Sequence, residues 1–339
     1  MKIIIIGDGK VGYSLAEHLS QESHDVTIID KNPEPLRKTS ELLDVMCIKG
    51  NGLSTKVMLE AGIKNADILI AATSSDEMNM VCALTGKKLG ADHTVARIRD
   101  PEYADELTVL KRELGLDLVI NPEQSAAREI ARLLRFPSAT DVEHFAKGRI
   151  EFVEITATQD MPFIGVPLKN IPRKNIENIL IGVVKRGDQI IIPNGDFQIA
   201  TDDRLNIIGR PNDVFAFCKK IGKYTQKIKK VMVVGGGMIA HYMAMNLKLN
   251  DIKVKIIEIN KERSIELSEM LPDTLVINGD GTDKDLLDSE NLGEMDAFIA
   301  LTGRDEENLI SAMLAKQSGV KKVIVKTTRI DNPVLFHDL

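Results

Sequence analysis

Two glycine-rich stretches are the residues of this 339-residue chain best suited to binding a ligand. The first, GDGKVG, places Gly7, Gly9 and Gly12 directly after the apolar run of residues 3–6. In such a turn Gly7 permits the tight bend, Gly9 lets the backbone approach a pyrophosphate, and Gly12 lets the next helix pack close to the strand. The free N–H groups at the start of that helix then face the phosphates, so the stretch predicts a dinucleotide site.

A carboxylate follows this turn near the expected position. Residues 26–29 are typical of a second strand, which ends in Asp30. In the dinucleotide-binding fingerprint the acidic residue stands roughly 20 residues beyond the glycines, and Asp30 lies close to that position. A carboxylate there accepts hydrogen bonds from ribose hydroxyls and repels a 2′-phosphate. The spacing therefore favours NAD(H) over NADP(H).

The second stretch, GGGMIA, repeats the pattern with its surroundings. Gly235 follows Gly7 at the same interval as Glu258 follows Asp30. Ala240 replaces the third glycine, which the fingerprint tolerates. Two further pairs, Thr73 with Thr302 and Asn79 with Asn308, share an interval that is longer by a single position. Such a repeat indicates a duplicated structural unit.

The elements that position these residues alternate between strands and helices, which predicts parallel sheets with helices on both faces. The fold class is therefore α/β, with two Rossmann-like doubly wound parallel-sheet domains separated by a small α+β lobe. We place the first Rossmann domain at residues 1–135, the small lobe at 136–224 and the second Rossmann domain at 225–339. The second copy lacks a counterpart of residues 118–135, so we expect either a chain truncated at its C-terminus or a short protein that borrows its last strand from a neighbour.

Composition narrows the functional classes. The net charge of −6 and the absence of Trp give little support to nucleic-acid binding. No apolar run is long enough for a bilayer, and the N-terminus is not a signal peptide, so we expect a cytoplasmic protein. The three cysteines, Cys47, Cys82 and Cys218, are far apart and fit no disulfide or zinc spacing, so we interpret them as buried thiols.

Several motifs together resemble one family. GDGKVG, Asp30, KGNG at 49–52, ATSSDEMNM at 72–80 and ARIRDPEY at 96–103 resemble the TrkA-type regulators of potassium uptake, the RCK or KTN proteins that sit beneath Trk and Ktr transporters. The resemblance implies a ligand sensor that binds NAD(H), with ATP and ADP as the alternative ligands. It also implies a homo-oligomer, a membrane potassium transporter subunit of the Trk type as partner, and a cytoplasmic location peripheral to the inner face of the membrane.

The resemblance assigns site residues by motif. In the first unit the phosphates fall to Gly7, Asp8, Gly9, Lys10 and Val11, the ribose to Asp30, the adenine side to Asn51, and the central cofactor region to Thr73 and Ser74; Arg97 matches the first arginine of the family's ARIR-type strand. The matching positions of the second unit are Gly235, Gly236, Gly237, Met238, Ile239, Glu258, Asp280, Leu301, Thr302 and Lys326. The departures are Ala240 and Lys326, since lysine is a point charge where arginine is a flat fork.

Two other functions remain open at this point. An NAD-dependent oxidoreductase acting on an unidentified small substrate needs an acid or base beside the nicotinamide, and of the six histidines only His144 has a plausible cleft position. A plain structural assembly protein is the other. We predict no catalytic residue and no metal site. Asp76 and Glu77, repeated as Asp305 and Glu306, are interpreted as helix-start acids, with a cation or inter-subunit site as the alternative.

Overall fold

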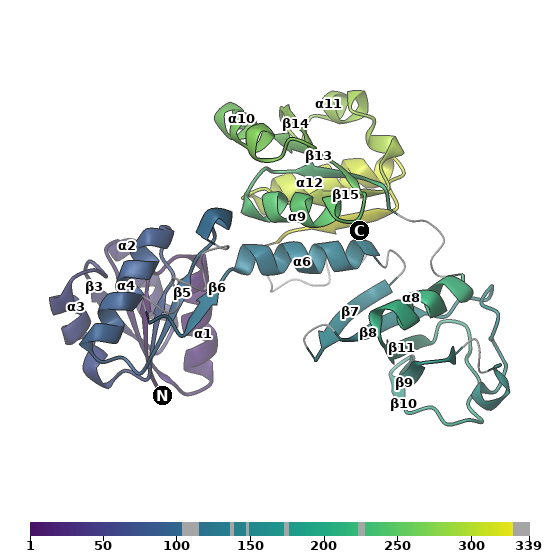
Figure 1. Ribbon diagram of the computed structural model, residues 1–339, viewed down its shortest axis with the longest axis horizontal. Helices are drawn as coiled ribbons and strands as arrows, with labels where there is room; N and C mark the ends of the chain where they lie inside the picture. Colours follow the sequence, from purple (N-terminus) through teal and green to yellow (C-terminus); the bar gives the residue numbers. More distant parts are fainter. Residues whose placement is uncertain (104–114, 136–138, 147–148, 173–175, 223–227, 328–339) are drawn as a thin grey trace. The chain divides into compact units, whose positions relative to one another are not determined.

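The computed structural model describes residues 1–103, 115–135, 139–146, 149–172, 176–222 and 228–327 (Figure 1). The chain divides into two compact units, Met1–Gln124 and Ser125–Leu339. Residues 224–227, which include the predicted boundary between the small lobe and the second Rossmann domain, lie outside the described residues, as do the side chain of His144 and the whole of His337. The domain boundaries at 135 and 224 stay a prediction.

The first unit is built on a six-stranded parallel sheet in the order β3-β2-β1-β4-β5-β6. Residues 3–6 are almost fully buried because β1 lies mid-sheet with apolar clusters on both faces. The strands are β1 (Lys2–Ile6), β2 (Asp25–Asp30), β3 (Met46–Lys49), β4 (Ile68–Ala71), β5 (His93–Arg97) and β6 (Leu118–Ile120). The helices are α1 (Lys10–Gln21), α2 (Pro33–Leu42), α3 (Thr55–Glu60) and α4 (Asp76–Leu89), with a 3-10 turn at Ile63–Asn65; α6 (Pro122–Arg135) follows β6 and continues into the second unit.

This order places a topological switch between β1 and β4, because the chain leaves β1 toward one edge of the sheet and returns on its other side. Helices α1 and α2 contribute to the apolar cluster on one face, and α3 and α4 to that on the other. In open sheets of this kind ligands bind beyond the carboxyl ends of the strands at the switch. The predicted α/β class is confirmed.

The second parallel sheet repeats the first with one strand fewer among the described residues, in the order β14-β13-β12-β15-β16. Its elements are β12 (Lys230–Val234), α9 (Met238–Lys248), β13 (Lys253–Glu258), α10 (Lys261–Met270), β14 (Leu275–Asn278), α11 (Lys284–Ser289), a 3-10 turn (Leu292–Glu294), β15 (Ala297–Ala300), α12 (Asp305–Gln317) and β16 (Lys322–Val325). Ala127, Ile130 and Leu134 of α6 belong to the same apolar cluster as α9, so this helix packs against the second sheet's layer.

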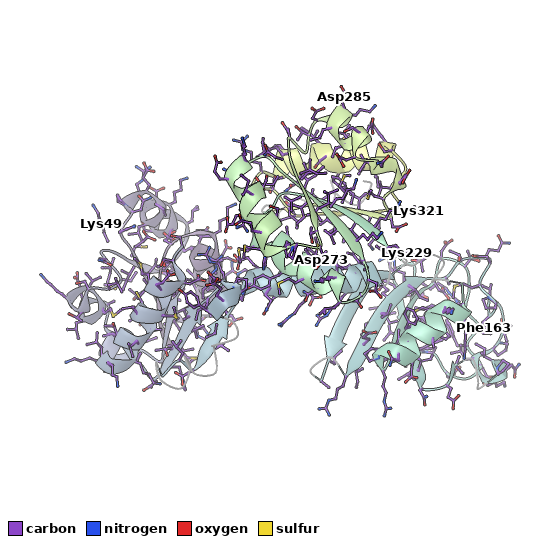
Figure 2. The ribbon with its side chains drawn as sticks, turned by 45° about the horizontal axis from the view of Figure 1, so that its top comes forward. Lys49, Phe163, Lys229, Asp273, Asp285 and Lys321 are labelled. Atoms are coloured by element: carbon purple, nitrogen blue, oxygen red, sulfur yellow. The ribbon has the colours of Figure 1, made fainter. Side chains whose placement is uncertain are left out.

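The small lobe is an antiparallel five-stranded sheet in the order β10-β9-β11-β8-β7. Its elements are β7 (Ala139–Phe145), β8 (Ile150–Thr156), a 3-10 turn (Leu168–Asn170), β9 (Ile179–Arg186), β10 (Gln189–Ile191), β11 (Arg204–Gly209) and α8 (Pro211–Lys220). Phe163, labelled in Figure 2, packs against its apolar core. Strand β7, with the sequence ATDVEHF, has no apolar run, and sequence reasoning did not identify it as a strand.

The cysteine expectation holds for two residues of three. Cys82 and Cys218 are buried, whereas Cys47 is only half-buried in β3, so the interpretation of three buried thiols is wrong for Cys47. Cys47 lies on β3, the edge strand of its sheet, which leaves it partly open to solvent. Burial raises the pKa of the Cys82 and Cys218 thiols to about 12.

Candidate functional site

The first glycine turn lies between β1 and α1, at the carboxyl end of the central strand. Gly7 has a φ of +104°, a conformation that favours glycine. A side chain at Gly12 would meet the carbonyl oxygen of Gly7 at 1.8 Å, so the close packing of α1 onto this turn depends on Gly12. A Cβ at Gly9 would meet no atom within 4 Å, which means that space is left above this residue.

Helix α1 begins at this open space. Gly9 is its N-cap, and the first intrahelical bond runs from the Tyr13 N–H to the Gly9 carbonyl at 2.9 Å. The N–H groups of Lys10, Val11 and Gly12 therefore have no partner within the helix. Together with the positive end of the helix dipole they form a site suited to an anion.

The carboxylate of Asp30 faces the same turn from the end of β2. Its Oδ2 accepts the N–H of Asp8 at 2.7 Å, and its Oδ1 accepts the N–H of Asn32 at 2.8 Å. Each carboxylate oxygen keeps a further lone pair, so the group can also accept ribose hydroxyls. The second unit copies this arrangement, with Glu258 Oε2 accepting the N–H of Gly236 at 2.6 Å.

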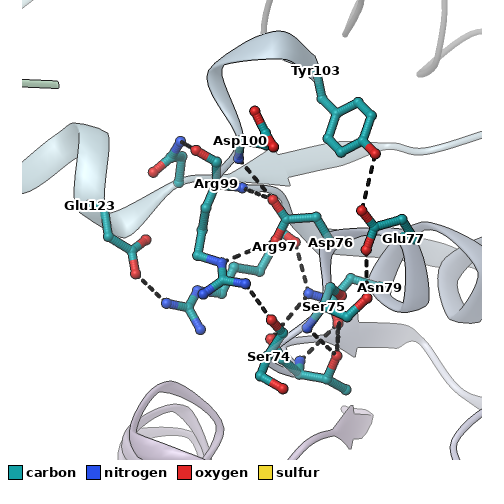
Figure 3. Close-up of polar contacts among 12 residues, drawn as sticks. Ser74, Ser75, Asp76, Glu77, Asn79, Arg97, Arg99, Asp100, Tyr103 and Glu123 are labelled. Atoms are coloured by element: carbon teal, nitrogen blue, oxygen red, sulfur yellow. Dashed lines mark hydrogen bonds and ion pairs between the residues drawn. The ribbon is translucent and has the colours of Figure 1, made fainter. Parts of the chain in front are cut away.

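A buried asparagine joins the next two strand ends. Asn79 is fully buried in α4; its Oδ1 accepts the N–H of Thr73 at 2.8 Å, and its Nδ2 donates to the Arg97 carbonyl at 2.8 Å. Figure 3 shows these bonds. Asn308 makes the same contacts to Thr302 and Lys326, at 2.8 and 2.9 Å. The amide thus fixes the carboxyl ends of β4 and β5 relative to each other in the first unit, and those of β15 and β16 in the second.

Two arginines complete the edge of the first site. The Arg97 guanidinium pairs with Glu123 at the start of α6, and Arg99 pairs with Asp76 at 3.0 Å and also donates to the Ser74 carbonyl (Figure 3). Arg99 follows the end of β5 rather than lying within it. Both guanidinium groups are held in place by carboxylates.

These features surround one pocket of about 570 Å³, within the range of nucleotide-sized sites. Of the predicted residues of the first unit, all but one line it: Gly7, Gly9, Lys10, Val11, Asp30, Asn51, Thr73, Ser74 and Arg97. Asp8 does not. Its side chain is 5 % exposed and accepts a hydrogen bond from the Thr39 hydroxyl at 2.8 Å, and burial raises the pKa of its carboxyl.

The second unit forms a pocket of about 540 Å³ at the matching place. Eight of the predicted residues line it: Gly235, Gly236, Gly237, Glu258, Asp280, Leu301, Thr302 and Lys326. Met238 and Ile239, the first residues of α9, do not line it. A Cβ at Gly237 would again meet no atom within 4 Å.

Sequence reasoning missed several lining residues. They are Lys31, Ser75, Met78 and Arg99 in the first pocket, and Ile259, Thr282, Arg304 and Glu307 in the second. Lys31 and Ile259 directly follow the strand-end carboxylates Asp30 and Glu258, so their position in the sequence could have identified them as lining residues. Ser75, Met78 and Glu307 line the pocket at the starts of α4 and α12, which only the folded chain brings over the strand ends.

The alternative site at Asp76 is not supported by its surroundings. Asp76 is 6 % exposed and accepts the backbone N–H groups of Arg99 and Asp100 at 2.6 and 2.8 Å. Glu77 bonds to Ser75 and Tyr103, and these hydrogen bonds lower the pKa of its carboxyl. Among the described residues there is no group of three or more His, Cys, Asp and Glu side chains that could hold a metal ion.

Family models match nearly all of the chain. The TrkA-N domain model matches residues 3–122 and 231–339, and the TrkA-C domain model matches residues 152–222. The Trk system potassium uptake protein trkA homolog 1 of Methanosarcina mazei is 37 % identical over 99 % of this chain and 84 % of its own length. The family models and the name of this relative confirm the predicted TrkA-type family of potassium uptake proteins.

Solved structures show the same fold. The GsuK channel superposes with a TM-score of 0.67 at 18 % identity, over 95 % of this chain and 61 % of its own. A GsuK channel bound to NAD has a TM-score of 0.66 at 18 % identity, over 95 % of this chain and 60 % of its own. No helix of the described residues is long and apolar enough to cross a membrane.

Proposed function

Since the chain belongs to the TrkA family of potassium uptake proteins, we propose that it is a regulatory subunit that gates a membrane potassium transporter by binding NAD(H) or an adenine nucleotide. The observation that carries the nucleotide half is the duplicated pocket at the β1–β4 and β12–β15 switch points. Each pocket combines free helix N–H groups, a strand-end carboxylate and an open space at a glycine. NAD in a GsuK channel of the same fold supports the choice of ligand.

The proposal includes the assembly. The chain acts as a homo-oligomer at the cytoplasmic face of the membrane, with domains at residues 1–135, 136–224 and 225–339. A nucleotide can shift such an assembly only by binding one of its states more tightly than the other. A pyrophosphate at Gly9 or Gly237 touches the N-terminus of α1 or α9, so a change in the tilt of these helices is the first step of the signal.

The histidines of the described residues give no support to the oxidoreductase alternative. Among the described residues, no histidine lines either pocket. His18 bonds to the Ser14 carbonyl on its own helix, and His93 pairs with Asp117 at the far end of β5.

Gly9→Val tests the proposal. The backbone of Gly9 is extended, with φ −84° and ψ −173°, and its Cβ meets no atom, so valine fits the fold while its methyl groups enter the phosphate space. We expect nucleotide binding at the first pocket to be lost, and the potassium uptake of cells that carry the variant to lose its response to that nucleotide. The control is Lys64→Met, because Lys64 lies in the 3-10 turn before β4, at the amino ends of the strands and away from the pocket. Normal, nucleotide-responsive uptake with an empty first pocket shows that this pocket is not the switch.

A further inference from the structure

The two pockets have matching backbone arrangements, but the side chains that line them differ in charge. The charged residues that line the first are Lys10, Lys31, Arg97 and Arg99 against Asp30. Those that line the second are Arg304 and Lys326 against Glu258, Asp280 and Glu307. The first lining therefore has an excess of cations and the second a slight excess of carboxylates.

Two positions account for much of the difference. Lys10 is the first residue of α1, and its counterpart at the start of α9 is Met238. Lys31 follows the carboxylate of Asp30, and its counterpart is Ile259. The ammonium groups of Lys10 and Lys31 make no hydrogen bond or ion pair within the part of the chain that the structure describes, so both remain available to a ligand.

Ion pairing does not remove the contrast. In the first pocket Arg97 and Arg99 are neutralised by Glu123 and Asp76, which leaves the two lysines against Asp30. In the second, Arg304 pairs with Glu307 at 2.9 Å, which leaves Lys326 against two carboxylates. One of these, Asp280, accepts hydrogen bonds from the backbone and hydroxyl of Thr282, and they lower the pKa of its carboxyl.

The side chain of Asp8 does not change this comparison. The Asp8 carboxylate accepts a hydrogen bond from the Thr39 hydroxyl and does not line the pocket. Its counterpart, Gly236, has no side chain, and Leu267 stands where Thr39 stands in the first unit.

We propose that the two pockets discriminate nucleotides by charge: the first binds an adenine nucleotide more tightly with each added phosphate, and the second does not. This inference rests on the proposed function, because it assigns ligand classes to the same two sites. The first pocket then binds ADP and ATP more tightly than a nucleotide of lower charge, such as the dinucleotide NADH, whereas the second pocket has no such preference for charge. One chain can thus respond to two different nucleotides.

The test is the dependence of affinity on ligand charge at each pocket alone. AMP, ADP and ATP are titrated by calorimetry into the full chain without divalent cations. Gly237→Val blocks the second pocket, so that binding to the first is measured alone, and Gly9→Val does the reverse. Circular dichroism checks that each variant is folded. A unit charge about 4 Å from an opposite one is worth about a fivefold change in affinity in bulk water, and more near a protein surface where the dielectric constant is lower. We expect the Kd of the first pocket to fall about tenfold per phosphate at low salt, and that of the second to stay flat or rise.

Exchanging the two lysines tests the cause. Lys10→Met with Lys31→Ile should flatten the series at the first pocket, and Met238→Lys with Ile259→Lys should steepen it at the second. Lys64→Met removes a lysine from the opposite edge of the first sheet and should leave the series unchanged. Equal charge dependence at both pockets, or a series that the exchange does not move, overturns the inference and leaves nucleotide sensing intact. Failure of all three nucleotides and NAD⁺ to bind either pocket overturns the proposed function itself.

Discussion

Removing the carboxylate of Asp30 is the most direct test of ribose recognition. Asp30→Ala takes away a charged acceptor, and hydrogen bonds to charged groups contribute about 1.5–3 kcal/mol each. Loss of one such bond weakens NADH binding about 10- to 150-fold. The same change removes the repulsion of a 2′-phosphate, so the preference for NADH over NADPH should narrow. Calorimetry in the Gly237→Val background measures the first pocket alone.

The structure also shows what must be controlled. Asp30 holds the N–H of Asp8 at 2.7 Å and that of Asn32 at 2.8 Å, so alanine loosens the turn as well as the ligand contact. Asp30→Asn removes the charge but keeps one of the two oxygens that accept the N–H groups of Asp8 and Asn32, while its NH2 group cannot accept the other. It should disturb the turn less than alanine does, and it should narrow the preference for NADH over NADPH with a smaller loss of NADH affinity. Unchanged NADH affinity in a folded Asp30→Ala chain, or tighter binding of NADPH than NADH by the intact chain, refutes the assignment.

Two further predictions concern stability. Asn79→Ala leaves the Thr73 N–H and the Arg97 carbonyl without the amide that bonds to both. We expect it to lower the free energy of unfolding in urea by about 2–4 kcal/mol, whereas Ser40→Ala at an exposed position should change it very little. A decrease below about 1 kcal/mol would show that the amide does not hold the ends of β4 and β5 together. Burial raises the pKa of Asp8 above its ordinary value of 3.8, so the native state keeps this proton at pH values where the unfolded chain has released it, and stability falls as pH rises through the raised pKa. Asp8→Asn should therefore be the more stable chain at pH 7, with the advantage shrinking as the pH approaches 4; parallel stability curves of the two chains would contradict this.

The fold, the glycine turns and the strand-end carboxylates could be predicted from the sequence because each depends on residues that are close together in the chain. A run of branched apolar residues before a glycine turn indicates a buried parallel strand, and both copies of the run form central strands. The strand-end carboxylates were placed by spacing alone. Strand β7 was missed because its residues, ATDVEHF, form neither an apolar run nor a strict alternation of polar and apolar residues.

The side chains that distinguish the two pockets were harder to find, because they come from elements far apart in the chain. Arg97 was interpreted as a ligand group from the ARIR motif, but the sequence does not show that Glu123 holds it, or that Asp76 holds Arg99 beside it. Met78 and Glu307 are the third residues of α4 and α12. Their correspondence is recognised only when the two copies of the repeat are aligned at the starts of these helices.

That alignment depends on where the repeat gains a residue. Helices α2 and α10 end at Leu42 and Met270, which are separated by the same interval as Gly7 and Gly235. Strands β3 and β14 begin at Met46 and Leu275, and their interval is longer by a single position. The extra residue therefore lies in the loop before the third strand, away from the carboxyl edge where the pockets form. With that loop excluded, the two copies are in register at the strand ends and helix starts. The difference in charge between the two pockets then comes from side-chain replacements on two backbones of matching conformation. Exchanging two side chains between the pockets can therefore test its effect on binding.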